Sequence, residues 1–131
     1  MFARGKGDNK KLYTVNVNGT DLKIVNDDFI TRGRNDWSPN GNNIAGDSGE
    51  SRQRKIYLMD VDGTELTELY SKGNVRAPTF SPDDGWMAFT GYIDNRRNSN
   101  GCEIYILRLR YNKLVRLTSN DYCDWQPRWG P

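Results

Sequence analysis

Short apolar runs separated by polar, glycine-containing turns recur along this chain, and the pattern predicts strands. The segments 12–22, 56–66 and 104–114 align with one another, and each carries a tyrosine in its second position. These tyrosines stand at positions 13, 57 and 105, so the repeat is 44 and then 48 residues long. A period of that length is typical of an architecture in which each repeat is one small sheet. No segment has the spacing of a helix of useful length.

Each repeat contains four strand signals. The tyrosine-bearing strand is almost continuously apolar, as expected for a strand covered on both faces. Asn18-Gly19 and Asp62-Gly63 follow it, and such dipeptides predict a two-residue hairpin turn with positive φ at both residues. Tyr111-Asn112 takes this place in the third copy. The returning strands are expected at 22–25, 66–69 and 114–117.

An aromatic residue and a Ser-Pro turn mark the other half of each repeat. The aromatics are Trp37, Phe80 and Trp129, which stand 24, 23 and 24 residues after the repeated tyrosines. Ser-Pro followed by Asn or Asp and then Gly is a turn sequence, because proline presets φ and glycine allows positive φ. The strands 43–46 and 86–89 follow these turns. Because the aromatics and tyrosines repeat, we expect them to pack between neighbouring sheets.

The motifs resemble those of TolB-type β-propellers, relatives of the WD-repeat propellers. Residues 78–82, 87–89, 104–105, 117–118 and 127–129 match the family pattern. The resemblance implies an all-β fold of propeller blades, each of four antiparallel strands. It implies three blades in one domain, residues 1–131, with approximate segments 1–30, 31–72, 73–120 and 121–131. The last segment would supply the inner strand of a blade split between the two termini.

Three positions depart from the family pattern. Asn35 replaces the proline of the other copies, Gly46 replaces the aromatic Phe89, and Gly130 replaces the serine of the turn. These changes predict loosened blade interiors. Matching Phe2-Ala3 with 44–45 and 87–88 places the start of the chain in the second strand of a blade.

Three blades cannot close a ring, and an open arc would expose apolar faces and a sheet edge. Propellers of this type commonly have six blades, so we expect a homodimer in which the C-terminal strand of one copy completes the N-terminal blade of the other. The alternatives are a piece of a longer propeller and an engineered half-propeller.

Composition narrows the functional classes. The chain has 19 basic and 17 acidic residues, and the net charge of +2 gives no indication of nucleic-acid binding. No apolar run approaches a membrane span, and Met1 to Gly7 lacks the apolar core of a signal peptide. The chain has no histidine, so histidine-dependent nucleophilic catalysis cannot arise within it. We therefore expect no enzyme, no catalytic residue, no bound metal and no cofactor. The acidic pair Asp60/Asp62 is interpreted as part of the Asp-Gly turn, and the pair Asp27/Asp28 as solvated acids in a link.

The candidate binding residues lie in the links that lead into the aromatic-ended strands. In a propeller the first strand of each blade lines the central channel, so side chains one and three positions before the aromatic are candidates for the channel or its mouth. An anionic ligand or acidic peptide bound by the arginines is one hypothesis, and solvated arginines balanced by aspartates is the other. The candidates for channel or partner binding are Arg34, Asp36, Arg76, Asp124, Trp125, Gln126 and Arg128.

The two cysteines, Cys102 and Cys123, leave two alternatives open. Two unpaired thiols is the favoured interpretation, because two cysteines make no disulfide framework. The strand order nevertheless puts both at the same face of the ring, so a disulfide is allowed.

The function expected first is a non-enzymatic scaffold that binds a protein or peptide. The resemblance supports this, because TolB works through protein partners, and it suggests the bacterial periplasm or cell envelope as location. The alternatives are the propeller region of a larger peptidase-type enzyme and a propeller that binds a small ligand or sugar.

Overall fold

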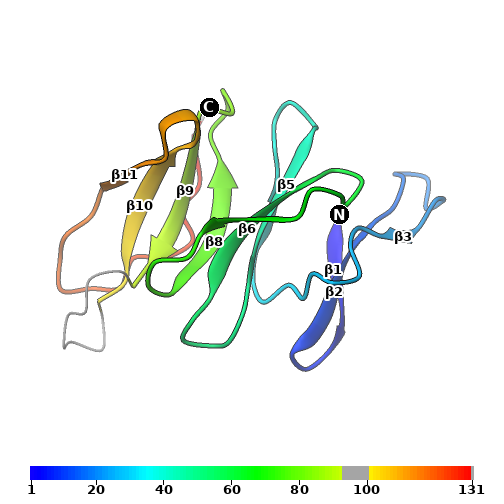
Figure 1. Ribbon diagram of the computed structural model, residues 1–131, viewed down its shortest axis with the longest axis horizontal. Coiled ribbons are helices and arrows are strands. Elements are labelled where there is room, and N and C mark those ends of the chain that lie inside the picture. Colours follow the sequence, from blue (N-terminus) through cyan, green and yellow to red (C-terminus); the bar gives the residue numbers. More distant parts are fainter. Residues whose placement is uncertain (93–100, 131) are drawn as a thin grey trace.

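The computed structural model describes residues 1–92 and 101–130 and shows three antiparallel sheets side by side (Figure 1). In the described part the single helical element is the 3-10 turn η1, Leu109–Tyr111. The all-β fold class is confirmed. Sheet one contains β1 (Phe2–Lys6), β2 (Asn9–Thr14) and β3 (Lys23–Ile24), in that order. Sheet two contains β4 (Asn35–Trp37), β5 (Asn43–Ser48), β6 (Lys55–Asp60) and β7 (Thr67–Tyr70), and sheet three contains β8 (Val75–Phe80), β9 (Trp86–Gly91), β10 (Glu103–Arg108) and β11 (Lys113–Arg116).

The repeated tyrosines give the three sheets a common register. Gly46 of β5 pairs with Tyr57 of β6, and Phe89 of β9 pairs with Tyr105 of β10. In sheet one, Phe2 pairs with Tyr13. Phe2 is therefore the counterpart of Gly46 and Phe89, and the alignment of Phe2-Ala3 with residues 44–45 and 87–88 was wrong by two residues. A shift of two keeps every side chain on the same face of the strand, so the apolar pattern could not distinguish the two registers.

The hairpins after β2 and β6 have longer turns than predicted. The N–H of Asp60 donates to the carbonyl of Thr64, and the N–H of Gly63 donates back to Asp60, which leaves three residues in the loop. Gly63 has a φ of 87° and Asp62 is not among the residues with positive φ, so the prediction of two positive-φ residues was wrong. The Asp62 side chain instead accepts from the N–H of Thr64, 2.9 Å away, and stabilises the turn locally.

An aromatic pair includes the repeated tyrosine of each sheet, also in the sheet where the sequence predicted a gap; in sheet one the pair is only half-buried and belongs to neither apolar cluster. The ring centroids of Phe2 and Tyr13 are 5.8 Å apart, and those of Phe89 and Tyr105 are 6.0 Å apart. In sheet two Gly46 has no ring, but Phe29 from the link before β4 lies 5.9 Å from Tyr57.

A Cβ on Gly46 would come within 2.8 Å of the Phe29 ring, so the glycine makes room for an aromatic that arrives from elsewhere in the chain. The expected loosening is therefore wrong for sheet two, because Phe29 is 2% exposed and fills the interior.

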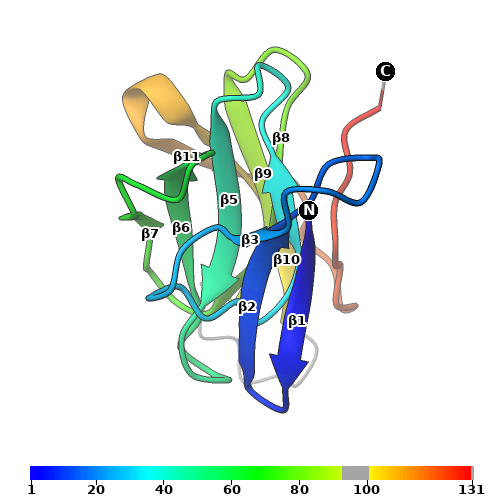
Figure 2. The ribbon, with the colours of Figure 1, turned by 90° about the vertical axis from the view of Figure 1, so that its right-hand side faces the viewer.

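Two apolar clusters hold the sheets together face to face, as the turned view shows (Figure 2). The cluster between sheets two and three includes Ala45, Ile56, Phe80, Phe89 and Tyr105. The cluster between sheets one and two contains Leu12, Val25, Phe29, Ile44 and Met59. Packing between sheets is thus confirmed for the repeated aromatic Phe80 and for Tyr105. Trp37 differs, because it is 38% exposed and its indole N–H donates to the carbonyl of Gly41 in its own turn.

Candidate functional site

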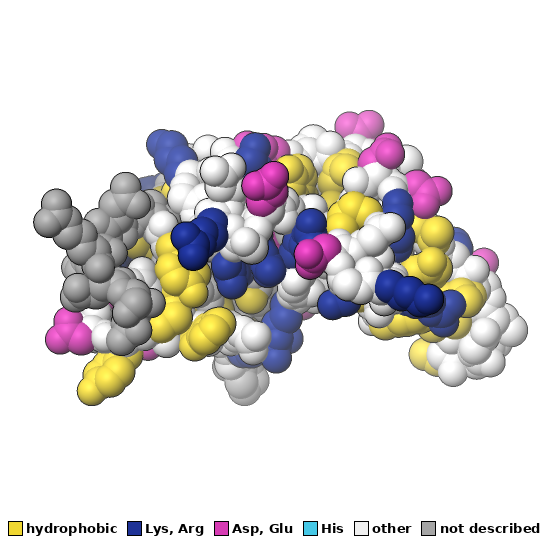
Figure 3. Space-filling model, turned by 90° about the horizontal axis from the view of Figure 1, so that it is seen from below, with side chains coloured by type: hydrophobic (Ala, Val, Ile, Leu, Met, Phe, Trp, Pro, Cys, Tyr) yellow, Lys and Arg dark blue, Asp and Glu magenta, His cyan; other side chains and the backbone are white. Residues whose placement is uncertain are grey.

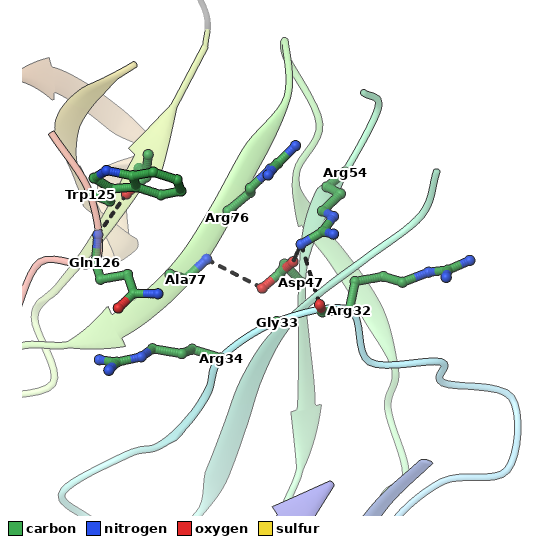
Figure 4. Close-up of a pocket in the computed structure, with 10 residues that line it drawn as sticks. Arg32, Gly33, Arg34, Asp47, Arg54, Arg76, Ala77, Trp125 and Gln126 are labelled. Atoms are coloured by element: carbon green, nitrogen blue, oxygen red, sulfur yellow. Dashed lines mark hydrogen bonds and ion pairs between the residues drawn. The ribbon is translucent and has the colours of Figure 1, made fainter. Parts of the chain in front are cut away.

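A cavity of about 220 Å³ lies where the inner strands of the sheets begin, next to the ends of β5 and β9. Figure 3 looks onto this end of the molecule and shows Lys and Arg side chains gathered across the middle of the face. The cavity collects residues from the link before β4, from β5, β8 and β9, and from the C-terminal segment (Figure 4). Its lining residues are Arg32, Gly33, Arg34, Asp47, Arg54, Arg76, Ala77, Thr90, Trp125 and Gln126.

The same backbone arrangement builds two walls of this cavity. Ala77 and Gln126 each stand three residues before a repeated aromatic, and both have a φ of 53°. The N–H of Ala77 donates to Oδ1 of Asp47 at 3.2 Å, and the N–H of Gln126 donates to Oγ1 of Thr90 at 2.9 Å. Asp47 and Thr90 are counterparts, since each follows the residue that pairs with a repeated tyrosine. The first contact joins sheets two and three, and the second joins sheet three to the C-terminal segment; we call these two contacts the junctions.

Both junction residues precede a proline, but the restriction that proline imposes favours extended φ and does not explain their φ of 53°. Ala77 precedes Pro78 and Gln126 precedes Pro127, and proline removes one N–H and restricts the residue before it. A register shift between Arg76 and Thr79 follows on β8. The side chains of β8 therefore do not alternate strictly between its two faces here, although the prediction of channel-facing residues depended on that alternation. Arg34, the counterpart before β4, precedes Asn35 and is not among the residues with positive φ.

A buried ion pair forms the base of the cavity. Asp47 is 0% exposed, and its Oδ2 lies 3.1 Å from Nη1 of Arg54. The same nitrogen of Arg54 donates to the carbonyl of Arg32 at 3.3 Å. Burial raises the pKa of the Asp47 carboxyl above its ordinary value, although the N–H of Ala77 and the Arg54 guanidinium act in the opposite direction. Asp47 thus joins two sheets and holds one of the arginines of the site.

The other arginines of the cavity have fewer anionic partners. Nη1 of Arg32 pairs with Asp8 at 2.7 Å, but Asp8 is on the surface and 94% exposed. Nη2 of Arg76 donates to the carbonyl of Ser51 at 2.6 Å, and its guanidinium lies 5.4 Å from the centre of the Tyr92 ring. Within the described residues, neither Arg34 nor Arg76 has a carboxylate within ion-pair distance.

Figure 4 shows that Arg32 and Arg34 leave the chain in opposite directions on either side of Gly33, with Arg34 on the side of Gln126. The two arginines therefore belong to opposite sides of the cavity. Arg34 shares its side with the C-terminal segment, whereas Arg32 shares its side with Arg54.

A disulfide fixes the wall that carries Trp125. Cys102, just before β10, is bonded to Cys123, and the N–H of Asp124 donates to the carbonyl of Cys102 at 2.9 Å. The favoured interpretation of two unpaired thiols was therefore wrong; the link after β11 folds back onto the start of β10, which the linear sequence did not show. Trp125 follows directly and is 62% exposed.

The structure divides the seven predicted site residues into three groups. Arg34, Arg76, Trp125 and Gln126 line the cavity. Asp36 and Arg128 line a separate groove, and their carboxylate and guanidinium are 3.8 Å apart. Asp124 lines neither, and its carboxylate accepts from the amide of Asn120 at 2.8 Å.

Asp36 serves a contact between sheets, because one of its carboxylate oxygens accepts from the hydroxyl of Thr79 and the N–H of Phe80. The residues that sequence reasoning left out of the site are Arg32, Asp47, Arg54 and Thr90. Arg54 lies in the loop between β5 and β6, which carries no turn motif that would place it at the cavity. Asp47 and Thr90 could have been found only from the correct register against the tyrosines.

In residues 1–92 and 101–130, no cluster of three or more His, Cys, Asp or Glu side chains is positioned to hold a metal ion. The described residues also contain no helix long and apolar enough to span a membrane.

Comparisons with known proteins give relatives in sequence and in structure. No protein-family model matches the chain. A curated relative, the uncharacterized protein Atu1656 of Agrobacterium fabrum, is 29% identical over 96 residues, which cover 72% of this chain and 31% of the relative. The chain therefore spans about a third of that protein's length.

Solved structures show the same arrangement of sheets. A protein assigned as TolB from Agrobacterium tumefaciens superposes with a TM-score of 0.78 at 24% identity, covering 94% of this chain and 43% of that one. TolB from Acinetobacter baumannii gives a TM-score of 0.67 at 29% identity, covering 85% of this chain and 27% of that one. The tricorn protease gives 0.68 at 12% identity over 95% of this chain and 12% of that one, which shows a shared fold alone.

The three sheets are blades of a β-propeller packed face to face, and the inner strand β8 and the link into the inner strand β4 reach the cavity, whereas sheet one has no inner strand among the described residues. The blades are of the TolB type, as the Ser-Pro turns, the paired tyrosines and the two TolB structures agree. Sheets one, two and three are therefore called blades one, two and three below.

Proposed function

We propose that this chain is a non-enzymatic β-propeller scaffold that binds a protein or peptide segment at the face carrying the cavity. The observation that carries the proposal is the position of Trp125. It is 62% exposed, stands two residues after the disulfide-bonded Cys123 and lines a cavity to which blades two and three contribute. Exposed tryptophans on rigid supports are frequent hot spots of protein interfaces, because they bury a large area at little entropic cost.

Two further features support a binding role in place of catalysis. The chain has no histidine, and the carboxyl of Asp47 at the cavity is fully buried and engaged with Ala77 and Arg54. An acid in that state holds the scaffold together and is inaccessible to a substrate. Arg34 and Gln126, by contrast, are exposed beside Trp125 and are available to a partner.

Selection from a displayed library of random peptides tests the proposal. Peptides enriched on the wild-type protein should lose most of their affinity on the variant Trp125→Ala. They should keep it on Tyr111→Ala, which removes a 60%-exposed aromatic from the opposite end of the blades. Binders that are equally sensitive to both variants, or no binders at all, would contradict a partner site at Trp125.

We propose further that two copies complete one six-bladed ring. The inner edge of β1 pairs with no strand in the described part of the chain, whereas the equivalent edges of β5 and β9 pair with the inner strands β4 and β8. Residues 124–130 carry the inner-strand motif without belonging to a sheet. Asn35 lies opposite Gly46 in blade two, so the matching register puts Pro127 of the partner subunit opposite Phe2.

The mass in solution tests the dimer. Size-exclusion chromatography with light scattering should give twice the 15.1 kDa of the chain. The variant Phe2→Glu should lower the mass to that of one chain, because a carboxylate would be buried without a partner at the seam. The matched variant Val17→Glu, at a fully exposed residue, should leave the dimer intact. A monodisperse wild-type monomer would contradict the proposal.

A further inference from the structure

The charges around the cavity are unequal in number. Four arginines contribute to its lining, Arg32, Arg34, Arg54 and Arg76. Asp47 neutralises Arg54 from within, and Asp8 neutralises Arg32 from the surface. Glu50 is the other carboxylate near the same loop, where it lines an adjoining hollow with Arg32 and Arg54. Among the described residues, Arg34 and Arg76 have no carboxylate at ion-pair distance, but Figure 4 shows the Arg76 side chain pointing away from Arg34, so Arg34 is the positive charge on the side of Gln126.

Their local contacts leave these two arginines different tasks. The guanidinium of Arg76 is engaged by the carbonyl of Ser51 and by the face of the Tyr92 ring, and Arg76 and Tyr92 line a separate hollow, so this arginine has a structural role. Its Nε is buried and, in the described part, has no acceptor. Arg34 makes no hydrogen bond or ion pair with the described residues and is exposed, so it can close over a ligand from the side of Gln126.

The size of the cavity limits what it can hold. At about 220 Å³ it is smaller than the roughly 300–1,000 Å³ of common small-molecule sites, so a nucleotide or an oligosaccharide does not fit. A single side chain does. Because the accessible polar groups are mainly arginine donors, an acidic side chain satisfies them better than a neutral one. Trp125 at the rim supplies an apolar surface for the residue next to that acid.

We infer that the cavity recognises one carboxylate side chain of an extended acidic segment, held by Arg34 on the side of Gln126 while Trp125 packs against its neighbour. This inference rests on the proposed partner-binding function and names the chemistry of the partner. A carboxylate accepts two parallel hydrogen bonds from a guanidinium, which gives direction as well as charge. The amide of Gln126 is an additional donor beside Arg34.

Two capped pentapeptides test the inference, Gly-Glu-Leu-Glu-Gly and its counterpart Gly-Gln-Leu-Gln-Gly. Binding is followed through the indole N–H signal of Trp125 in NMR spectra, which is assigned with Trp125→Phe. The glutamate peptide should bind at least roughly tenfold more tightly than the glutamine peptide, and the difference should shrink as salt is raised. Equal affinities, or a glutamate peptide that does not bind, would overturn the inference.

The arginine variants localise the effect. Arg34→Gln should weaken binding of the glutamate peptide severalfold and leave binding of the glutamine peptide unchanged, whereas Arg76→Gln removes a guanidinium that points away from Arg34 and should have a smaller effect. Arg110→Gln removes the same charge from η1 at the other end of the blades, and it should change neither affinity. If Arg110→Gln weakens peptide binding as much as Arg34→Gln does, the peptide is attracted by the overall positive charge and not by a specific site, and the inference fails. Arg34 makes no structural contact in the described residues, so this variant is expected to fold.

Two further arms separate the possible outcomes. Sodium phosphate and sodium acetate at matched ionic strength should displace the glutamate peptide weakly. Tight phosphate binding together with no peptide binding would show that the cavity binds a free anion, and it would overturn the inference that the carboxylate belongs to a peptide. If display yields Trp125-dependent peptides that lack acidic residues and ignore Arg34→Gln, the carboxylate inference fails while the partner-binding function stands.

Discussion

Blades two and three have the same strand register, but different side chains occupy the equivalent positions. In blade three the interior aromatic Phe89 sits on the strand itself, whereas in blade two Phe29 reaches in from a link and Gly46 gives it space. The junction after blade three uses the neutral hydroxyl of Thr90, and the junction after blade two uses the buried carboxylate of Asp47. The positions to be filled are repeated, while the residues that fill them are not. Asp47 also holds Arg54 at the cavity, which a threonine could not do.

The largest expected effect tests whether the two aromatics are equivalent. Phe29→Ala and Phe89→Ala should each lower the free energy of unfolding by about 3–5 kcal/mol, because both rings are fully buried against a tyrosine. Urea denaturation measures both. A loss of less than about 1 kcal/mol for Phe29→Ala alone would mean that blade two tolerates an empty interior.

Much of the fold followed from the repeat, and the failures have physical causes. The tyrosine period, the Ser-Pro turns and the strand order were predictable, because they depend on local turn chemistry and on alternation. The role of Phe29 was not, because a long-range contact leaves no periodic signal. The predicted alignment of Phe2 was wrong by two residues, because a shift of two residues leaves each side chain on the same face of the strand.

For the candidate site, arginines near the inner strands were predictable from blade geometry, but their grouping was not. Arg54 reaches the cavity through its contact with Asp47, and Trp125 is placed by the Cys102–Cys123 bond. Asp36, which the sequence put in the same set, is instead engaged by Thr79 and Phe80 of the next blade.

A smaller effect separates the two junctions. Asp47→Ala should cost about 2–3 kcal/mol, because it leaves the guanidinium of Arg54 and the N–H of Ala77 without their acceptor, and water can reach Arg54 in part. Thr90→Val should cost about 1 kcal/mol, since Gln126 is exposed and its N–H can find water. The same denaturation experiment compares them. Equal costs would show that the charge at Asp47 has no structural role beyond that of a hydroxyl.

The smallest effect is a pair of opposite pH slopes. Glu103 in blade three is also buried and pairs with an arginine, at 2.6 Å from Arg116. Burial acts to raise the pKa of Glu103, but hydrogen bonds from Thr118 and Arg116 outweigh it, and the pKa is lower than its ordinary value of 4.5. Glu103 therefore stabilises the fold above pH 4.5, and this contribution is lost as the pH falls through the lowered pKa.

The raised pKa of Asp47 gives the reverse dependence. Its contribution is complete below the unfolded value of 3.8 and is lost as the pH rises through the raised pKa. The destabilisation by Glu103→Gln should accordingly be greatest at neutral pH, and that by Asp47→Asn should be greatest in acid. Denaturation at a series of pH values measures both, and parallel slopes for the two variants would contradict the different environments of the two carboxylates.

The central claim is that the face where the inner strands begin is where a partner segment binds. The most direct measurement is a titration of the ¹⁵N-labelled chain with the glutamate peptide, followed through backbone amide signals. The amides of Ala77 and Gln126 at the two junctions should shift together and saturate at one affinity. Those of Gly19 and Gly63, in hairpin turns at the opposite end of the blades, should stay in place. Shifts confined to the hairpin turns, or spread evenly over both ends, would contradict the account.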